Sequence, residues 1–207
     1  APVPRPYLNR TWRQRIDAFD PFIKLYRSKL IQTDRASTLA AGHLLVNSRF
    51  TAQNIQNAYG RESQVVYFAV DTDTFHPQPR EKQNFVLSVG ALRPNKGFDF
   101  LIESLAQIPS SQRPPLRIIG NADDEQERAF LTNLAHSLQV QLIIETMVDL
   151  PTLVQRYNQA QIVVYAPVRE PFGLVPLEAM ACAVAVVGVA EGGVTESVVH
   201  EKTGLLT

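Results

Sequence analysis

Two glutamates with seven residues between them are the first feature of this chain whose spacing suggests chemistry. Glu170 and Glu178 lie in the stretch EPFGLVPLEAMACAVAVVGVAEGG, after the strand-like run QIVVYAPV and at the start of the helix-like run LVPLEAMACA. We therefore expect the first carboxylate in a loop and the second a turn or two into a helix. Ligands of open α/β sheets gather at this end of a strand, where helix N–H groups suit a phosphate.

Two acids beside a phosphate site need a physical reason, because like charges repel. A sugar nucleotide supplies one, since its ribose and its transferred sugar both carry hydroxyl groups that donate charge-assisted hydrogen bonds to carboxylates. In this interpretation Glu178 accepts from the ribose and Glu170 accepts from the sugar. The alternative is that both are solvated acids favoured by a helix dipole, and the spacing alone leaves both interpretations open.

The letters around the acids resemble a known family. EPFGLVPLE resembles the E-x7-E signature of family-4 retaining glycosyltransferases, which adopt the GT-B fold. SVGALRPNKGFDFLIESLA is similar to that family's strand, basic loop and helix, and residues 43–60 and 65–77 resemble its interdomain region. AEGGVTESVVHEKTGLL is similar to its glycine-pair loop and the segment that follows. The resemblance covers about residues 40–207 in the family's order, which makes chance similarity a poor explanation.

The resemblance implies a set of donor-binding residues, with no cofactor and no metal. Glu170 would contact hydroxyls of the donor sugar and Glu178 would bind the ribose. Lys96 would neutralise the departing diphosphate, on which negative charge develops in the transition state. The backbone N–H groups that face the donor would be those of Phe172, Gly173 and Leu174. At Gly173 the absence of a Cβ would let the backbone approach the ligand closely.

One position departs from the family pattern. An arginine usually follows the strand glycine and completes the diphosphate clamp, but here Gly90 is followed by Ala91. Arg93 would reach phosphate with its planar guanidinium or remain solvated, and only the loop geometry decides between these. A surface position beside a turn is likewise the alternative for Lys96. Donor binding is therefore a firmer prediction than catalysis.

The chain beyond residue 83 has the pattern of a Rossmann-like α/β domain. Apolar runs of strand length at 84–90, 116–120, 141–147, 162–168 and 183–189 alternate with runs of helix length. Short, branched and apolar strands are typical of a doubly wound parallel sheet covered by helices on both faces, here the C-terminal half of a GT-B fold with a partial N-terminal segment. We expect selectivity for the nucleotide base at Thr146, Met147 and Val148.

Composition and resemblance together suggest the domain boundaries. We expect residues 1–75 to be the incomplete tail of an acceptor-side domain, and 76–83 to be a linker within the proline-containing stretch DTDTFHPQPREKQ. Residues 84–207 would be the donor-binding domain, without the helices that follow TGLL in the family. Such a fragment is expected to transfer no sugar by itself, because positioning of the acceptor supplies much of the catalysis.

Charge and cysteine content bear on partners and compartment. The 207-residue chain has no net charge and so no overall attraction to nucleic acid. Residues 1–40 are basic, which suits an anionic acceptor or peripheral contact with a membrane, although the apolar stripe of Phe19, Phe22, Ile23, Tyr26 and Leu30 favours an ordinary helix with a core-facing side. A single cysteine and scattered histidines predict no metal site. With no apolar run of 18 residues, we expect a cytoplasmic protein or one at the cytoplasmic face of a membrane.

Other function classes make different predictions. A nicotinamide oxidoreductase needs a G-x-G-x-x-G turn, and SVGALRPNKG spaces its glycines too far apart. A non-catalytic nucleotide-sugar binding or regulatory module would bind donor without transfer, and a purely structural protein would bind no nucleotide. The favoured hypothesis is a fragment of a retaining glycosyltransferase, a hexosyltransferase type, that takes a UDP- or GDP-sugar. Its acceptor, a saccharide or a lipid-linked glycan, is left open.

Overall fold

The computed structural model of this chain describes residues 20–207. This part divides into two compact units, one that ends at Tyr67 and one from Phe68 to Thr207. All of the residues predicted to bind donor lie in the second unit.

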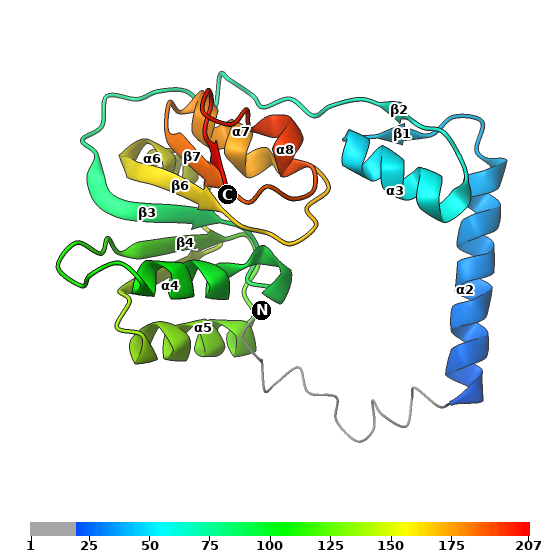
Figure 1. Ribbon diagram of the computed structural model, residues 1–207, viewed down its shortest axis with the longest axis horizontal. Helices are drawn as coiled ribbons and strands as arrows, with labels where there is room; N and C mark the ends of the chain where they lie inside the picture. The colour runs from blue at the N-terminus through cyan, green and yellow to red at the C-terminus, as the bar shows by residue number, and fades with distance from the viewer. Residues whose placement is uncertain (1–19) are drawn as a thin grey trace. The chain divides into compact units, whose positions relative to one another are not determined.

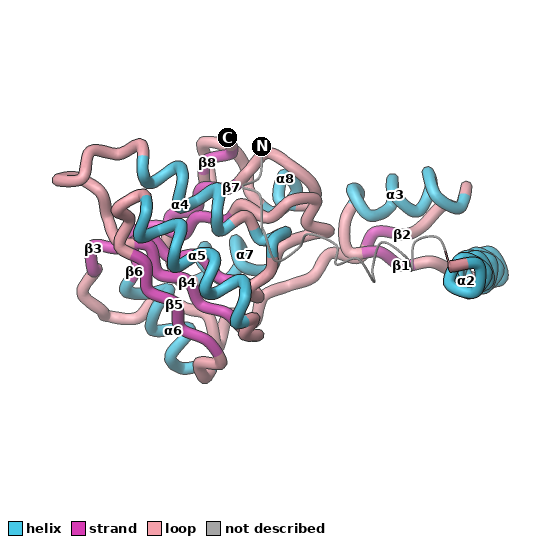
Figure 2. Tube along the Cα trace, turned by 90° about the horizontal axis from the view of Figure 1, so that it is seen from below, coloured by secondary structure: helices cyan, strands magenta, loops and turns pink. Residues whose placement is uncertain are grey.

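The first unit contains a long helix and a small parallel βαβ arrangement. Its elements are α2 Pro21–Ala40, β1 Leu45–Val46, α3 Arg49–Tyr59 and β2 Gln64–Val65. The strands β1 and β2 pair in parallel and are connected by α3 (Figure 2). The Ser48 hydroxyl caps α3 by accepting from the Thr51 N–H at 2.9 Å, and Gly60 ends the helix in the left-handed region at φ 69°. This arrangement lies within residues 1–75, whose assignment to the tail of an acceptor-side domain stays a prediction.

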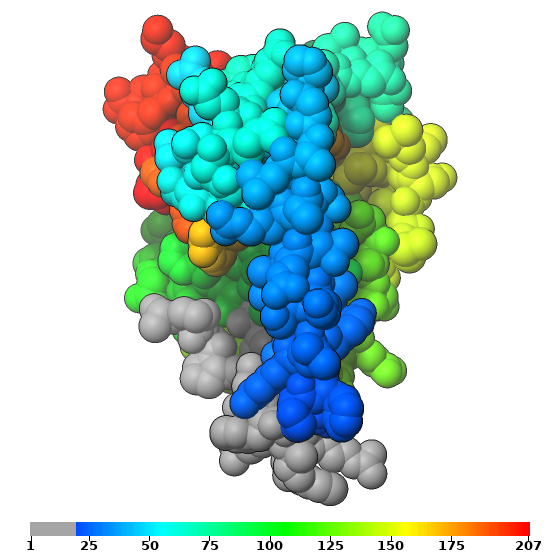
Figure 3. Space-filling view, turned by 90° about the vertical axis from the view of Figure 1, so that its right-hand side faces the viewer, coloured from blue at the N-terminus to red at the C-terminus, as the bar shows by residue number. Residues whose placement is uncertain are grey.

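The apolar stripe of α2 does not face a core, which corrects the prediction for this segment. Phe22 is 79% exposed, Tyr26 is 65% exposed, and no residue of the helix is buried. Figure 3 shows the length of α2, in blue, open to the viewer. Phe19 lies outside the described residues. The spacing predicts a helix correctly but cannot identify what its apolar side packs against. None of the helices described is long and apolar enough to cross a membrane.

The second unit is built on a six-stranded parallel sheet. The strand order is β5-β4-β3-β6-β7-β8. The strands are β3 Gln83–Val89, β4 Leu116–Gly120, β5 Leu142–Thr146, β6 Ala160–Tyr165, β7 Ala185–Gly188 and β8 Leu205–Leu206. The helices are η2 Pro94–Lys96, α4 Phe98–Ala106, α5 Glu125–Ser137, α6 Leu150–Gln159, α7 Leu174–Ala181 and α8 Val194–Ser197. The sequence pattern predicts β3 to β7 and α4 to α7, but not η2, α8 or β8.

Side chains alternate along the strands and build a core on each face of the sheet. In β3, Leu87 packs in a cluster with Tyr157 of α6, whereas Val86 packs in a second cluster with Phe98 of α4. Helices α4 and α5 therefore cover one face, and α6 and α7 cover the other (Figure 1). This confirms the predicted doubly wound α/β fold.

The order of the strands reverses between β3 and β6, which makes this pair the switch point of the sheet. The chain builds β3, β4 and β5 in one direction and then crosses back to add β6 on the other side of β3. The loops that follow β3 and β6 therefore diverge toward opposite faces, and their separation opens a crevice in folds of this kind. Lys96 and Glu170 are carried by these two loops.

The segment before β3 is attached to the sheet unit. Phe75 is 8% exposed, and its ring meets that of Tyr157 edge-on with centroids 5.9 Å apart. The Gln78 N–H donates to Asn158 Oδ1 at 2.7 Å, and Asn158 Nδ2 donates to the His76 carbonyl at 3.2 Å. The assignment of 76–83 to a linker stays a prediction, and in the structure its first residues are held against α6.

Candidate functional site

Three loops meet at the carboxyl end of the sheet where β3 and β6 lie side by side. The loop after β6 is tied to the loop after β3, because the Val168 N–H donates to the Asn95 carbonyl at 2.8 Å. It is also tied to the loop after β7, because the Gly193 N–H donates to the Glu170 carbonyl at 2.8 Å. Backbone hydrogen bonds on both sides thus hold Glu170 in place.

A close backbone approach explains the glycine after β7. A Cβ at Gly193 would lie 2.2 Å from the Pro171 carbonyl oxygen and 2.6 Å from the Phe172 Cα. Both of these atoms belong to backbone and cannot swing aside, so only glycine lets the two loops pack at this distance. The glycine pair of the sequence therefore supports the loop that carries Glu170.

Lys96 and Glu170 form an ion pair across the site. Lys96 Nζ lies 2.8 Å from Glu170 Oε2, and the two side chains are 20% and 17% exposed. The aliphatic part of Lys96 passes over Gly90, where an added Cβ would meet its Cγ and Cδ at 3.4 Å. The structure thus brings together Gly90, Lys96 and Glu170, all of which the sequence predicts as site residues. The two members of the ion pair are 74 residues apart in the sequence.

Glu178 has a different kind of partner. The hydroxyl of Tyr157 donates to Glu178 Oε2 at 2.6 Å. Burial raises the pKa of the Glu178 carboxyl, and the hydrogen bond from Tyr157 offsets part of that rise. Tyr157 is fully buried, and burial together with the charge of Glu178 raises the pKa of its phenol well above the usual value. The pair is therefore a neutral phenol bound to a half-buried carboxyl.

A second tyrosine lies close to both acids. Burial raises the pKa of Tyr165, and the negative charges of Glu170 and then Glu178 raise it further. Its ring also fixes the start of α7, because a Cβ at Gly173 would lie 2.9 Å from Tyr165 Cε1. The two glutamates of the signature therefore share one phenol as a neighbour, which makes them parts of one site.

Sequence reasoning did not find either tyrosine. Tyr165 ends the apolar run of β6 and Tyr157 stands among polar residues of α6, and neither position marks its hydroxyl as part of a site. The available signal was the hydroxyl itself, because a buried tyrosine normally requires a hydrogen-bond partner for its O–H. The sequence does not name that partner, which for Tyr157 is 21 residues away.

The N-terminus of α7 lies beside the site and has no side-chain cap. Gly173 stands at the N-cap position with φ 88° and offers no side chain to cap the helix. Leu174, the first residue of the helix, is 39% exposed. Phe172 is buried and meets the ring of Phe68 edge-on at 5.9 Å. An ammonium group, a helix N-terminus and two carboxylates are thus gathered at this corner of the sheet.

The remaining predicted residues lie outside this cluster. Arg93 is exposed just before η2, and its side chain has no hydrogen-bond or ion-pair partner in residues 20–207. Thr146 ends β5, at the edge of the sheet, and its hydroxyl accepts from Arg128 Nη2 at 2.9 Å. Met147 is 73% exposed and Val148 packs against the core. The ligand roles assigned to these residues stay predictions.

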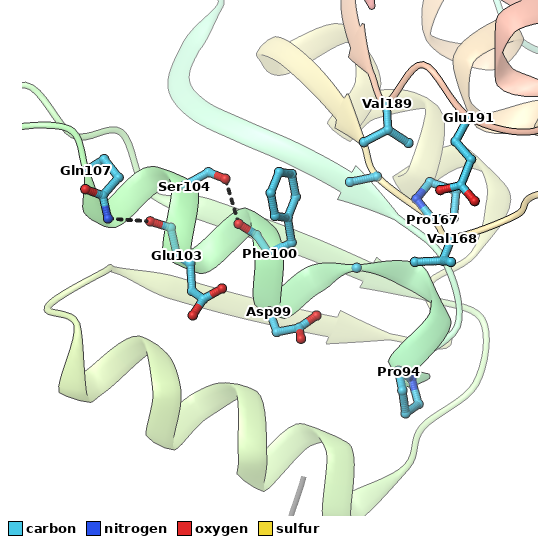
Figure 4. Close-up of a pocket in the computed structure, with 12 residues that line it drawn as sticks. Pro94, Asp99, Phe100, Glu103, Ser104, Gln107, Pro167, Val168, Val189 and Glu191 are labelled. Carbon is cyan, nitrogen blue, oxygen red and sulfur yellow. Dashed lines mark hydrogen bonds between the residues drawn. The ribbon is translucent and has the colours of Figure 1, made fainter. Parts of the chain in front are cut away.

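A cavity of about 560 Å³ lies next to the candidate site but does not contain it. Pro94 and Gly97, from the same turn as Lys96, line one end, and side chains of α4 and of the loops after β6 and β7 complete it (Figure 4). None of the glutamates or the lysine of the candidate site lines this cavity.

Metal-binding side chains are also not grouped in the described chain. Among residues 20–207, no group of three or more His, Cys, Asp or Glu side chains is placed to hold a metal ion. Asp71 and Asp73 have an Asp-x-Asp spacing, but Asp71 closes a turn by accepting from the Asp73 N–H at 3.0 Å and the Thr74 hydroxyl at 2.6 Å.

Comparison with known proteins assigns this architecture to a class and then to a family. The parallel sheet with its covering helices matches solved glycosyltransferase structures of the GT-B fold. Residues 70–207 match the family described as Glycosyl transferases group 1. Since this range is more than half of the chain, the chain belongs to that family.

Individual relatives match parts of their own length. An uncharacterised glycosyltransferase of Methanocaldococcus jannaschii is 34% identical over 128 residues, which is 61% of this chain and 32% of that protein. The structure of HepE from Anabaena in complex with UDP-glucose aligns with a TM-score of 0.72 and 26% identity over 81% of this chain and 50% of that chain. The C-terminal domain of the group 1 protein LpcC from Francisella tularensis aligns with a TM-score of 0.58 and 25% identity over 67% of this chain and 80% of that chain. The chain thus spans about a third of the archaeal relative and half of the Anabaena protein.

Proposed function

We propose that this chain is the donor-binding part of a retaining glycosyltransferase of the family-4 type and takes a nucleotide-diphosphate sugar. The observation that carries the proposal is the contact between Lys96 and Glu170 at 2.8 Å, where the loops after β3 and β6 diverge, with Glu178 on the adjoining helix. The Anabaena protein of similar fold was solved with UDP-glucose, which supports a nucleotide sugar as the ligand class.

Each group of the site has a task in the proposed complex. The Lys96 ammonium moves from Glu170 to the diphosphate and neutralises the charge that develops as the sugar leaves. Glu170 accepts hydrogen bonds from hydroxyls of the sugar, and Glu178 accepts from the ribose. The first N–H groups of α7 face the phosphates, where the helix dipole favours negative charge. In this scheme protein groups take the place of a metal ion, and the sugar passes to an acceptor hydroxyl with its anomeric configuration retained.

A second candidate function is binding of a nucleotide sugar without transfer. Two observations favour it: Ala91 stands where the family has an arginine, and Arg93 is exposed without a partner in the described chain. Lys96 would then hold the diphosphate alone, which is sufficient for affinity but weak for stabilising a leaving group. Both candidates share the same donor site and differ only in turnover.

Calorimetry followed by a turnover assay tests the proposal and separates the two candidates. UDP-glucose, GDP-mannose and ADP-glucose are titrated into the full chain, and we expect at least one dissociation constant below about 1 mM. The same titration with Lys96→Met should weaken binding at least tenfold. Release of nucleoside diphosphate in the presence of acceptor sugars or lipid-linked glycans would support the transferase, and binding without release supports the module. Absence of binding to all three donors would contradict both.

A further inference from the structure

Tyr157 lies beneath the proposed donor site and contacts one of its acids. We propose that Tyr157 is a positioning residue: its buried hydroxyl holds one oxygen of the Glu178 carboxylate, so that the other oxygen is presented to the ribose hydroxyls of the donor. This inference rests on the proposed function and extends it to a residue of the core.

The geometry makes Tyr157 a rigid support. The side chain is fully buried, and its ring packs edge-on against Phe75 with centroids 5.9 Å apart. A side chain held by packing in this way keeps a single rotamer, so its hydroxyl has a fixed position. From that position the hydroxyl donates to Glu178 Oε2 at 2.6 Å. The bond therefore fixes the orientation of the carboxylate on α7.

Comparison with a second half-buried glutamate shows what is unusual about Glu178. Glu145 of β5 accepts from Arg117 and from Arg156, and these two cations outweigh burial and lower the pKa of its carboxyl. Glu178 forms no ion pair in residues 20–207, and burial raises its pKa. Glu145 is paired as a structural acid would be. Glu178 instead has one partner, the neutral hydroxyl of Tyr157, and no cation.

The hydrogen-bond count leaves acceptor capacity on Glu178. A carboxylate has about four acceptor positions, and the Tyr157 hydroxyl is the one hydrogen-bond donor to this carboxylate in the described chain. A cation such as Arg117 would neutralise the group, whereas a neutral phenol orients it and leaves the charge for another donor. Neutral vicinal hydroxyls, such as those of ribose, fit this remaining capacity.

The neighbouring groups place the ribose site next to the diphosphate site. The ring of Tyr165 packs against Gly173 at the start of α7, the helix that carries Glu178, and the negative charges of Glu170 and Glu178 both raise the pKa of Tyr165. Glu170 in turn contacts Lys96, the proposed ligand of the diphosphate. In a nucleoside diphosphate the ribose adjoins the phosphates, and a ligand that reaches from Lys96 would bring its ribose toward Glu178.

Removal of the hydroxyl tests this role with a matched pair of ligands. UDP, GDP and ADP are titrated into the full wild-type chain, and the tightest is compared with its 2′,3′-dideoxy analogue. For Tyr157→Phe we expect about fivefold weaker binding of the ribonucleotide, the effect of one hydrogen bond, and a change below about twofold for the dideoxy analogue. Tyr59→Phe is the control, because the Tyr59 hydroxyl donates to a carboxylate, Asp34, at 2.5 Å in the other unit.

The pH dependence of binding gives a readout that a purely structural role would not move. Protonation of Glu178 removes its charge and reduces its acceptor capacity, so ribonucleotide affinity should fall as the pH drops through its pKa. The Tyr157 bond favours the charged form, so Tyr157→Phe should raise that pKa and shift the fall in affinity to higher pH. The other titratable groups near Glu178 are Tyr165, Cys182 and Glu170, and burial raises the pKa of the Cys182 thiol to about 11. The phenol and the thiol remain neutral over this range, and Glu170 is present in both the wild-type chain and Tyr157→Phe, so the shift between the two profiles reports on Glu178.

The outcomes separate the inference from the function on which it rests. Equal losses for both ligands, or no loss for either, would overturn the positioning role while leaving donor binding intact. If none of the three diphosphates binds to the wild-type chain, the proposed function fails and the positioning role fails with it. Should Tyr157→Phe not fold, Glu178→Gln provides the test: we expect it to abolish the preference for ribose over dideoxyribose, and full retention of that preference would overturn the inference.

Discussion

At the scale of single residues, the ion pair between Lys96 and Glu170 implies that Glu170 and a bound diphosphate compete for the Lys96 ammonium. The ammonium that the proposal assigns to the diphosphate is 2.8 Å from a carboxylate, and both side chains are mostly buried. A diphosphate must therefore replace or share this contact, and the charge of Glu170 opposes its entry. In the proposal the same carboxylate contributes only when a sugar is attached, because the sugar hydroxyls would donate to it.

This competition predicts opposite effects for two ligands. In Glu170→Gln the ammonium of Lys96 loses its anionic partner, so UDP or GDP without a sugar should bind about fivefold more tightly, as expected for a partly buried pair. The corresponding nucleotide sugar should gain less or bind more weakly, because an amide accepts hydrogen bonds from hydroxyls less strongly than a carboxylate. Calorimetry with both ligands measures the difference. Glu125→Gln, an exposed acid at the start of α5, should leave both affinities unchanged.

Equal changes in affinity for the two ligands would argue against a role of Glu170 in sugar binding. Weaker binding of the sugar-free diphosphate would argue that the ion pair preorganises Lys96 rather than competing for it.

The sequence points to the charged residues of the candidate site but not to their supports. Spacing and resemblance single out Glu170, Glu178 and Lys96, and all three lie around one corner of the sheet, while their ligand roles stay predictions. The sequence does not identify Tyr157 and Tyr165, because neither periodicity nor spacing distinguishes a tyrosine that contacts a site acid from one that only packs in the core. The sequence also does not fix the position of the Arg93 side chain, because Arg93 lies in the loop between β3 and η2 and the conformation of that loop decides where the side chain points.

At the scale of elements, the loop that carries Glu170 depends on the loop after β7. Gly193 packs against the backbone of Pro171 and Phe172 and donates to the Glu170 carbonyl. Gly193→Ala should force the loops apart, lower the free energy of unfolding by about 2 kcal/mol and weaken nucleotide-sugar binding. Urea unfolding and calorimetry measure the two effects. Gly42→Ala is the matched control, because nothing lies within 4 Å of a Cβ there.

An unchanged affinity for nucleotide sugar in a folded Gly193→Ala variant would indicate that the loop after β7 does not position the donor site.

The elements themselves were largely predictable. Apolar strands that alternate with amphipathic helices have a strong periodic signal, and β3 to β7 and α4 to α7 appear where the pattern predicts them. Strand β8 has two residues and α8 has four, too few for a period to be recognised. In α2 the period was recognised but the packing was not, because a helical stripe does not specify its partner.

At the scale of the whole molecule, the described chain is two compact units, and the proposed site belongs to one of them. Both apolar clusters are formed by residues from Val70 onward, and so are all of the contacts of Lys96, Glu170, Glu178 and Tyr157 described above. The isolated C-terminal domain of the Francisella protein, which has a similar fold, was crystallised by itself. The second unit of this chain likewise has its own apolar cluster on each face of its sheet.

We accordingly expect residues 68–207 to fold and to bind donor without the remainder of the chain. The expressed segment should unfold in one cooperative transition, since each face of its sheet is covered by its own helices. Its affinity for the nucleotide sugar that the full chain prefers should agree with that of the full chain within about threefold, because every proposed ligand is retained. Thermal unfolding by circular dichroism and calorimetry test the two expectations. A folded segment with affinity more than tenfold weaker would show that residues before Phe68 contribute to the donor site, and a segment that does not fold would show that the core depends on them.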